Sequence, residues 1–271
     1  MASKGTVALI GFGEAGMAFA GAWRVTARAY DIKTDDPALA AAKRADYART
    51  GIVGTDTLAD ALDGATLIMS LVTADQALIA AQAAAKSIAP GALYCDFNSV
   101  APQTKQEAAR LIEAAGAAYA DVAVMAPVHP AGLAVPMLVS GADAGAALAG
   151  LGFSLRRIEG PVGRASTIKM LRSVMVKGIE ALTAECFLAA RKAGVADEVA
   201  ASLDASGPDS GWAARAEYNL SRMRAHGLRR AAEMEEAAKT LYGLGQSSDM
   251  ARAAAKVQRR IGAAHQASEA A

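Results

Sequence analysis

The stretch Val7–Ala20, VALIGFGEAGMAFA, governs how the rest of the chain is interpreted. It begins as an apolar strand, passes through glycines at positions 11, 13 and 16, and continues in small residues that favour a helix. In the spacing GxGxxG, the first glycine permits a tight turn, the second lets the backbone approach a pyrophosphate, and the third lets the helix pack on the strand. The stretch therefore predicts a dinucleotide-binding turn, and a turn that is merely glycine-rich is the alternative. The residues of this turn are Gly11, Phe12, Gly13, Glu14, Ala15 and Gly16.

An acidic residue, Asp31, ends the next strand-like run, ARAYD, about 20 residues after the first glycine. A carboxylate at this place can accept hydrogen bonds from ribose hydroxyls, and it repels the additional phosphate of NADP. The sequence therefore predicts NAD as the cofactor. NADP is the alternative because Arg28 and Lys33 lie nearby, and a cap within the turn DIKTDD is the other interpretation of Asp31.

Strand-like and helix-like runs alternate along the first part of the chain. The strand-like runs are TVALIG, ARAYDI, TLIMSLV, ALYCDF and AAYADVAV, with helix-like segments between them. This alternation predicts an α/β fold with a doubly wound parallel sheet over residues 1–163. Two later runs, VPMLVSG and FSLRRIE, leave little room for crossover helices, so we expect them to extend the sheet in mixed orientation.

The pattern changes to continuous helix after GPVGRAS. Residues 166–195 contain no proline and, apart from Gly194 near the end of the run, a single glycine, Gly178. Their apolar residues recur at helical spacing, which predicts one long interdomain helix. Further helical runs follow, so an all-helical domain is expected over residues 164–271. Lys169 lies one turn into the long helix, where a partly desolvated lysine could exchange a proton with a substrate oxygen. A solvated surface lysine is the stronger alternative from the residues alone, and Lys177 on the same helix is expected to be one.

Composition excludes several classes of function. The 271 residues carry 28 basic and 27 acidic side chains, which argues against electrostatic capture of nucleic acid. No apolar run approaches the ~20 residues of a membrane span, and the first residues lack a secretory signal, so a cytoplasmic protein is expected. Cys95 and Cys186 lie in apolar surroundings and are expected to be small buried hydrophobes in a reducing compartment. Three scattered histidines and no Cys/His spacing predict no metal site, and no GxSxG elbow or P-loop is present.

Three motifs together carry a resemblance: GFGEAG, DFNSVAPQTKQEAA and GPVGRASTIKMLRS. They resemble the β-hydroxyacid dehydrogenases, the group that contains 3-hydroxyisobutyrate and 6-phosphogluconate dehydrogenases, and most of all a bacterial branch of 6-phosphogluconate dehydrogenase-like NAD-binding oxidoreductases. The likeness spans nearly the whole chain, including AHGLRRAAEMEEAAKTL. It implies a dinucleotide-binding Rossmann domain over residues 1–163 and a helical domain for substrate binding and dimerisation over residues 164–271. It also implies a homodimer with interleaved C-terminal helices.

The resemblance also implies roles for individual residues. Lys169 matches the catalytic lysine, a general acid in reduction and a general base in oxidation. Asn98 and Ser99 match a polar pair near the nicotinamide and the substrate, with ordinary turn chemistry as the alternative. The residues expected to line the cofactor after the third strand-like run are Leu71, Val72 and Thr73, with helix capping by Thr73 as the alternative.

Departures from the family pattern lie on the substrate side. Residues 121–130 read DVAVMAPVHP where the family has D-A-P-V-S-G-G, so Met125 replaces a polar donor at a position expected to contact substrate. Arg172 and Ser173 stand where amide or imidazole side chains are usual, and both are expected to contact the substrate. Arg172 could hold an anionic substrate group, with a solvated helix arginine as the alternative. His226 and Glu233 are spaced by seven on a helix and are expected to face the substrate cleft, with an exposed charged helix face as the alternative.

The combined prediction is an NAD(P)-dependent oxidoreductase that moves hydride between nicotinamide and a small hydroxy acid or a related alcohol or carbonyl compound. Lys169 would handle the proton. Imine reduction on the same scaffold and a non-catalytic NAD sensor are the alternatives.

Overall fold

The computed structural model describes residues 6–23, 25–206 and 211–269, and its contacts divide the chain into two compact units. The first unit is Met1–Lys169 and the second is Met170–Ala271. The division falls inside one long helix, a few residues beyond the boundary near Gly163 expected from the sequence.

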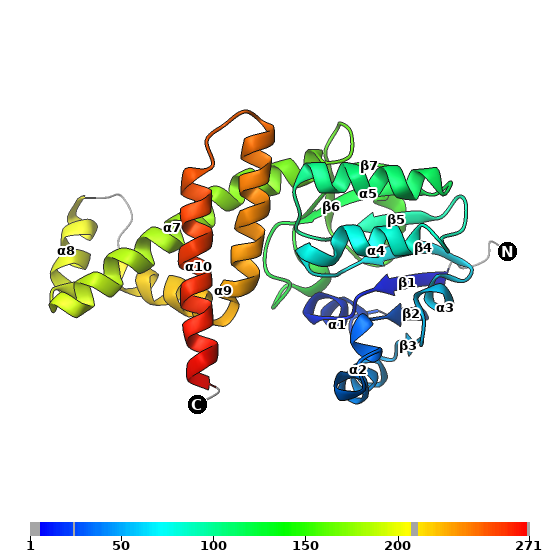
Figure 1. Cartoon of the computed structure of the whole chain (residues 1–271), viewed down its shortest axis with the longest axis horizontal. Coiled ribbons are helices and arrows are strands. Elements are labelled where there is room, and N and C mark those ends of the chain that lie inside the picture. The colour runs from blue at the N-terminus through cyan, green and yellow to red at the C-terminus, as the bar shows by residue number, and fades with distance from the viewer. Residues whose placement is uncertain (1–5, 24, 207–210, 270–271) are drawn as a thin grey trace. The chain divides into compact units, whose positions relative to one another are not determined.

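The first unit contains one eight-stranded sheet with the strand order β3-β2-β1-β4-β5-β6-β7-β8 (Figure 1). All neighbouring strands are parallel except β6 and β7, which are antiparallel. The predicted doubly wound sheet and its mixed orientation at the far end are thereby confirmed. The strands are Thr6–Ile10 (β1), Ala27–Tyr30 (β2), Val53–Gly54 (β3), Ala65–Ser70 (β4), Leu93–Asp96 (β5), Ala118–Val124 (β6), Met137–Gly141 (β7) and Leu155–Arg157 (β8).

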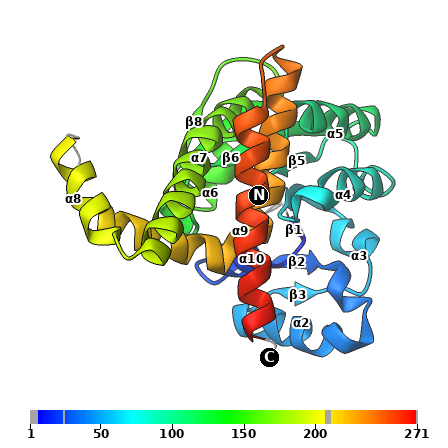
Figure 2. The same cartoon turned by 60° about the vertical axis from the view of Figure 1, so that its left-hand side comes forward.

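Helices cover both faces of this sheet, which explains why the inner strands consist of nearly continuous apolar residues such as Leu9 and Ile68. Phe19 of α1, Tyr47 of α2 and Leu148 of α6 belong to the core on one face. The other face is covered by α3, α4 and α5, and Figures 1 and 2 show α4 and α5 side by side there. The helices are Glu14–Ala20 (α1), Pro37–Thr50 (α2), Leu58–Leu62 (α3), Ala77–Ala84 (α4), Pro102–Ala114 (α5) and Gly145–Gly150 (α6), with short 3₁₀ turns Ile32–Thr34 (η1), Ala74–Gln76 (η2) and Gly132–Ala134 (η3).

The long helix predicted for residues 166–195 is confirmed as α7, Arg164–Ala193, which begins in the first unit and continues into the second. The second unit is completed by α8 (Ala196–Ser206), α9 (Trp212–Gly243) and α10 (Asp249–Glu269). Its core is rich in alanine, so helix backbones approach closely, most of all where Gly227 of α9 meets Gly262 of α10. No helix among the described residues is long and apolar enough to span a bilayer.

Candidate functional site

The glycine-rich turn lies at the carboxyl end of β1, between that strand and α1. Gly11 has a φ of +82°, a conformation that favours glycine. A Cβ at this position would lie 2.7 Å from the carbonyl oxygen of Leu71 and 2.8 Å from Cγ1 of Val72. At Gly13 a Cβ would meet no atom within 4 Å. The turn is therefore packed on its inner side and open at Gly13, which fits the close approach of a pyrophosphate.

Asp31 supports this turn from within. Its Oδ2 accepts a hydrogen bond from the Phe12 amide at 2.7 Å, and its Oδ1 accepts one from the Lys33 amide at 3.0 Å. The turn-capping interpretation of Asp31 is thus realised, because the second bond caps η1. The carboxylate is buried, and each of its oxygens keeps capacity for a further hydrogen bond, as ribose recognition requires.

Sequence reasoning missed Lys43, which also holds the turn. This lysine of α2 is buried, and its Nζ donates to the Phe12 carbonyl at 2.6 Å and contacts Asp46 Oδ2 at 2.8 Å. The hydrogen bond from Lys43 lowers the pKa of the Asp46 carboxyl. A lysine on a surface helix gave no signal for this contact, because its partner lies 31 residues earlier in the chain.

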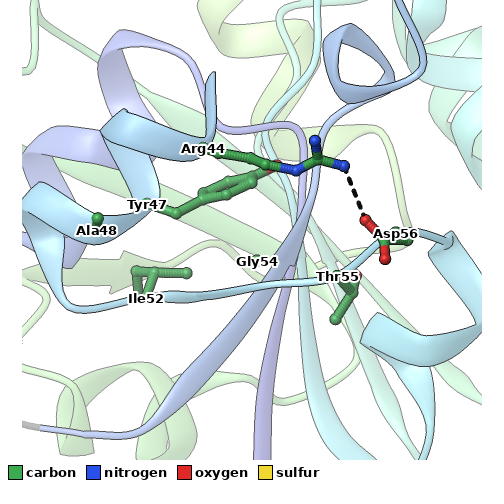
Figure 3. Close-up of a pocket in the computed structure, with 7 residues that line it drawn as sticks. All are labelled: Arg44, Tyr47, Ala48, Ile52, Gly54, Thr55 and Asp56. Carbon is green, nitrogen blue, oxygen red and sulfur yellow. Dashed lines mark hydrogen bonds and ion pairs between the residues drawn. The ribbon is translucent and has the colours of Figure 1, made fainter. Parts of the chain in front are cut away.

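A small hollow of about 240 Å³ lies beside α2 and the end of β3 (Figure 3). Tyr47 forms one wall and packs its ring against that of Phe12, with 5.0 Å between the centroids. Burial, with the nearby charge of Asp31 as a second cause, raises the pKa of Tyr47. Arg44 and Asp56 form an ion pair of 3.0 Å at the hollow, so its charged groups are already matched.

The predicted cofactor-lining loop follows β4 and is held by Asn98. The Oδ1 of Asn98 accepts a hydrogen bond from the Val72 amide at 2.7 Å, and its Nδ2 donates to Ser70 Oγ at 3.0 Å. Asn98 is buried, so its amide fixes the loop of Leu71 and Val72 against the glycine turn. Thr73 precedes η2, and its side chain makes no capping bond to that turn.

Lys169 and Ser99 meet in the first unit. The Lys169 Nζ lies 2.5 Å from Ser99 Oγ, and both residues are half-buried. Ser99 follows directly after Asn98 at the carboxyl end of β5, the edge of the sheet where α/β proteins bind their ligands. The lysine and serine singled out in the sequence are thus direct neighbours, although 70 positions separate them.

The first turn of α7 determines where Lys169 lies, and this turn is anchored by Asp121 of β6. Asp121 Oδ2 accepts hydrogen bonds from the amides of Gly163 at 3.1 Å and Ser166 at 3.0 Å, and Oδ1 accepts one from the Ser166 hydroxyl at 2.6 Å. The Ala165 amide donates to Ser140 Oγ at 3.0 Å. Amides at the start of a helix have no partner within it, so a strand supplies the cap here.

Met125 lines an apolar cavity of about 380 Å³ in the first unit. Its backbone amide donates to the Pro136 carbonyl at 2.8 Å. Its side chain and that of Ile168, the neighbour of Lys169 in the sequence, pack against the same buried cluster and line the same cavity. The remaining lining residues are Met137, Leu138, Ser154, Leu155 and Arg156.

The other predicted substrate residues belong to the second unit. Arg172 is exposed, whereas Ser173 is buried and accepts a hydrogen bond from Lys177 at 3.3 Å. Glu233 forms an ion pair with the same lysine at 2.6 Å. His226 is half-buried on α9.

Two expectations about single residues are wrong. Lys177 is only 6% exposed, because Glu233 neutralises it inside the helical unit. Cys186 is exposed on α7, whereas Cys95 is buried in β5, where burial raises the pKa of its thiol. Both cysteines are free thiols, and no cluster of metal-ligating side chains occurs among the described residues.

Comparison with known families covers most of the chain. Residues 6–151 match the NAD binding domain of 6-phosphogluconate dehydrogenase. Residues 190–261 match DUF1932, a domain of unknown function.

The chain is also similar to individual proteins. An uncharacterized 28.5 kDa protein of Methanothermus fervidus is 31% identical over 147 residues. These residues are 54% of this chain and 56% of that protein, so the match spans about half the length of this curated relative. The crystal structure of a conserved hypothetical protein from Sinorhizobium meliloti is 38% identical, with a TM-score of 0.74 over 98% of this chain and 90% of that one. The 3-hydroxyisobutyrate dehydrogenase of Mycobacterium tuberculosis shares the fold at 16% identity, with a TM-score of 0.76 over 96% and 94% of the two chains.

Proposed function

Because the chain belongs to the 6-phosphogluconate dehydrogenase NAD-binding family within the β-hydroxyacid dehydrogenase superfamily, we propose that it is an oxidoreductase acting on a small hydroxy acid or a related alcohol or carbonyl compound. The contact of Lys169 with Ser99 at the carboxyl edge of the sheet is the observation that carries this proposal. Hydride transfer is the chemistry that a bound nicotinamide supplies. The chain's own residues must then hold the cofactor, orient the substrate and move one proton.

The residues around the glycine turn fit a dinucleotide. Gly11 leaves no space for a side chain, Gly13 leaves open space, and Asp31 offers a carboxylate at the end of β2. We infer that these residues would hold the pyrophosphate and the adenosine ribose, and that Leu71, Val72 and Asn98 would line the nicotinamide side. The negative charge of Asp31 favours NAD over NADP.

Lys169 would act on the oxygen of the reacting carbon. In oxidation its neutral amine would take the hydroxyl proton of the substrate, and in reduction its ammonium would return a proton to the carbonyl oxygen. The Ser99 hydroxyl would orient the Lys169 nitrogen. The apolar side chains of Met125 and Ile168 would exclude water near this position.

The test measures turnover of a panel of hydroxy acids, alcohols and imines. Turnover is monitored through the absorbance of the reduced nicotinamide, with NAD and with NADP in separate assays. Lys169→Ala should lower kcat by about 10²–10⁴-fold, with NAD affinity, measured by calorimetry, little changed. Lys192→Ala is the matched control, because Lys192 is an exposed lysine near the other end of α7.

The results separate the alternatives. Full activity in Lys169→Ala would contradict the proton-transfer role. Tight NAD binding without turnover on any compound would favour a non-catalytic sensor, and turnover confined to imines would favour imine reduction.

A further inference from the structure

Three ionisable side chains in the first unit are completely buried: Asp96 at the end of β5, Lys105 of α5 and Asp121 of β6. Lys105 contacts both carboxylates. The Lys105 Nζ lies 2.9 Å from Asp96 Oδ1 and 3.4 Å from Asp121 Oδ1. It also donates to the Asp96 carbonyl at 2.6 Å. One ammonium thus joins two carboxylates from neighbouring strands.

The surrounding groups balance the remaining negative charge. The Tyr119 hydroxyl donates to Asp96 Oδ2 at 2.5 Å, and burial, followed by the charge of Asp96, raises the pKa of this phenol, so that it stays protonated. The backbone amides of Gly163, just before α7, and of Ser166, in its first turn, donate to Asp121 where the helix dipole is positive. A buried ion pair loses its hydration, and a well-packed apolar set of side chains could stabilise the fold equally well. Stability alone therefore gives no reason for three buried charges here.

One side of this cluster supports the predicted cofactor loop. Asp96 Oδ1 accepts a hydrogen bond from the backbone amide of Asn98 at 2.8 Å. Asn98 in turn holds the Val72 amide, and Ser99 is the next residue. The position of the Ser99 hydroxyl therefore depends on Asp96.

The other side supports the lysine. Asp121 anchors the amides of Gly163 and Ser166 and the hydroxyl of Ser166. Lys169 follows Ser166 by three positions, slightly less than one helical turn. The position of the Lys169 side chain therefore depends on Asp121.

The geometry points to Lys105 as a positioning residue, which joins Asp96 to Asp121 and thereby sets the Ser99 hydroxyl and the Lys169 amine against each other. This inference rests on the proposed function of Lys169. Lys105 is 0% exposed and lies beneath the site, so it acts only through its two carboxylate partners. Without it, two buried carboxylates would face each other, and the start of α7 would move or loosen.

The first experiment needs no substrate. Hydrogen exchange at the start of α7, over residues 163–169, is compared between the full-length wild-type chain and Lys105→Met. We expect exchange there to become at least severalfold faster, because its anchor at Asp121 is disturbed. Lys43→Met is the matched control: it removes a second buried lysine of the same unit, and it should leave α7 unchanged while weakening NAD binding.

The second experiment uses turnover. In Lys105→Met we expect kcat to fall by about 10²-fold, the cost of a misplaced catalytic group, with a smaller change in NAD affinity. The isotope effect on kcat with 4-deuterated cofactor should rise, because hydride transfer then limits the rate. A merely structural loss would lower the amount of active enzyme without altering this isotope effect.

Ser166→Ala keeps the test decisive if Lys105→Met does not fold. It removes the hydroxyl bond to Asp121 and keeps the backbone bond, so it should change exchange and kcat in the same direction by a smaller factor. Unchanged exchange in the first turn of α7, or an unchanged isotope effect, would overturn the role of Lys105. Absence of turnover in the wild type would instead overturn the proposed function, and the exchange experiment would still decide whether Lys105 orders α7.

Discussion

Phe12 illustrates how single contacts shape the candidate cofactor site. Its amide donates to Asp31, its carbonyl accepts from Lys43, and its ring packs on Tyr47. Three side chains therefore fix one residue between Gly11 and Gly13. Pre-organisation of this kind lowers the entropy lost when a ligand orders a loop. Asp31 thus has a structural role within the turn in addition to the recognition role proposed for it.

Two substitutions separate these roles of Asp31. Asp31→Asn keeps one oxygen for the Phe12 amide and removes the charge that repels the additional phosphate of NADP, so the preference for NAD over NADP should fall by tenfold or more, about 1.4 kcal/mol. Asp31→Ala removes the acceptor as well and leaves a buried amide without its partner, at a cost of about 1–3 kcal/mol. We expect both cofactors to bind weakly to Asp31→Ala. Calorimetric titration of both variants with each cofactor measures this, and an unchanged ratio in Asp31→Asn would contradict the charge argument.

At the level of secondary-structure elements, strands and helices with long periodic patterns could be predicted from the sequence. A very short strand and the buried lysines that pair with other elements could not. The inner strands and α7 could be predicted because burial on both sheet faces and helical spacing leave long, distinct patterns. β3 consists of the two exposed residues Val53 and Gly54, which leave no apolar run. Lys169 and Ser99 could be chosen from motifs. By contrast, Lys43, Lys105 and Lys177 look like solvated helix lysines, because the partners that bury them lie on other elements.

The crossing of α9 and α10 gives a prediction at this scale. A Cβ at Gly262 would lie 2.8 Å from the Leu228 backbone nitrogen, and one at Gly227 would lie 2.4 Å from the Gln258 carbonyl oxygen. Because backbone atoms cannot rotate away, Gly262→Ala should lower the free energy of unfolding by about 1–3 kcal/mol. Thermal and urea unfolding at fixed protein concentration measure the loss.

Gly178→Ala provides the comparison for this substitution. A Cβ at Gly178 of α7 meets no atom within 4 Å in the chain, so alanine should stabilise the helix by up to about 1 kcal/mol through its higher helix propensity. Equal effects of the two substitutions would show that helix propensity, and not the close crossing, sets the cost at Gly262.

At the scale of the whole molecule, the helical unit combines paired charges in its interior with apolar side chains on its exterior. Inside, Glu180 pairs with Arg230 and accepts a hydrogen bond from Gln258 at 3.1 Å. Outside, α7 carries Leu171, Met175 and Leu182, whose spacing of four and seven places them on one face of the helix. Met175 is 65% exposed and Leu182 is 56% exposed in the single chain. Such a stripe is costly in water and suits contact with a second copy of this chain.

The homodimer implied by the family resemblance can be tested on this face. Light scattering of the wild type should give about twice the chain mass of 27.5 kDa. The double substitution Met175→Glu and Leu182→Glu should shift the particle toward the mass of one chain, because burying two carboxylates without partners opposes association. Ile79→Glu is the control, since Ile79 is 54% exposed on α4 of the other unit and should leave the mass unchanged. A monomeric wild type would contradict the dimer. A dimer that survives the double substitution would show that its interface does not include this face of α7.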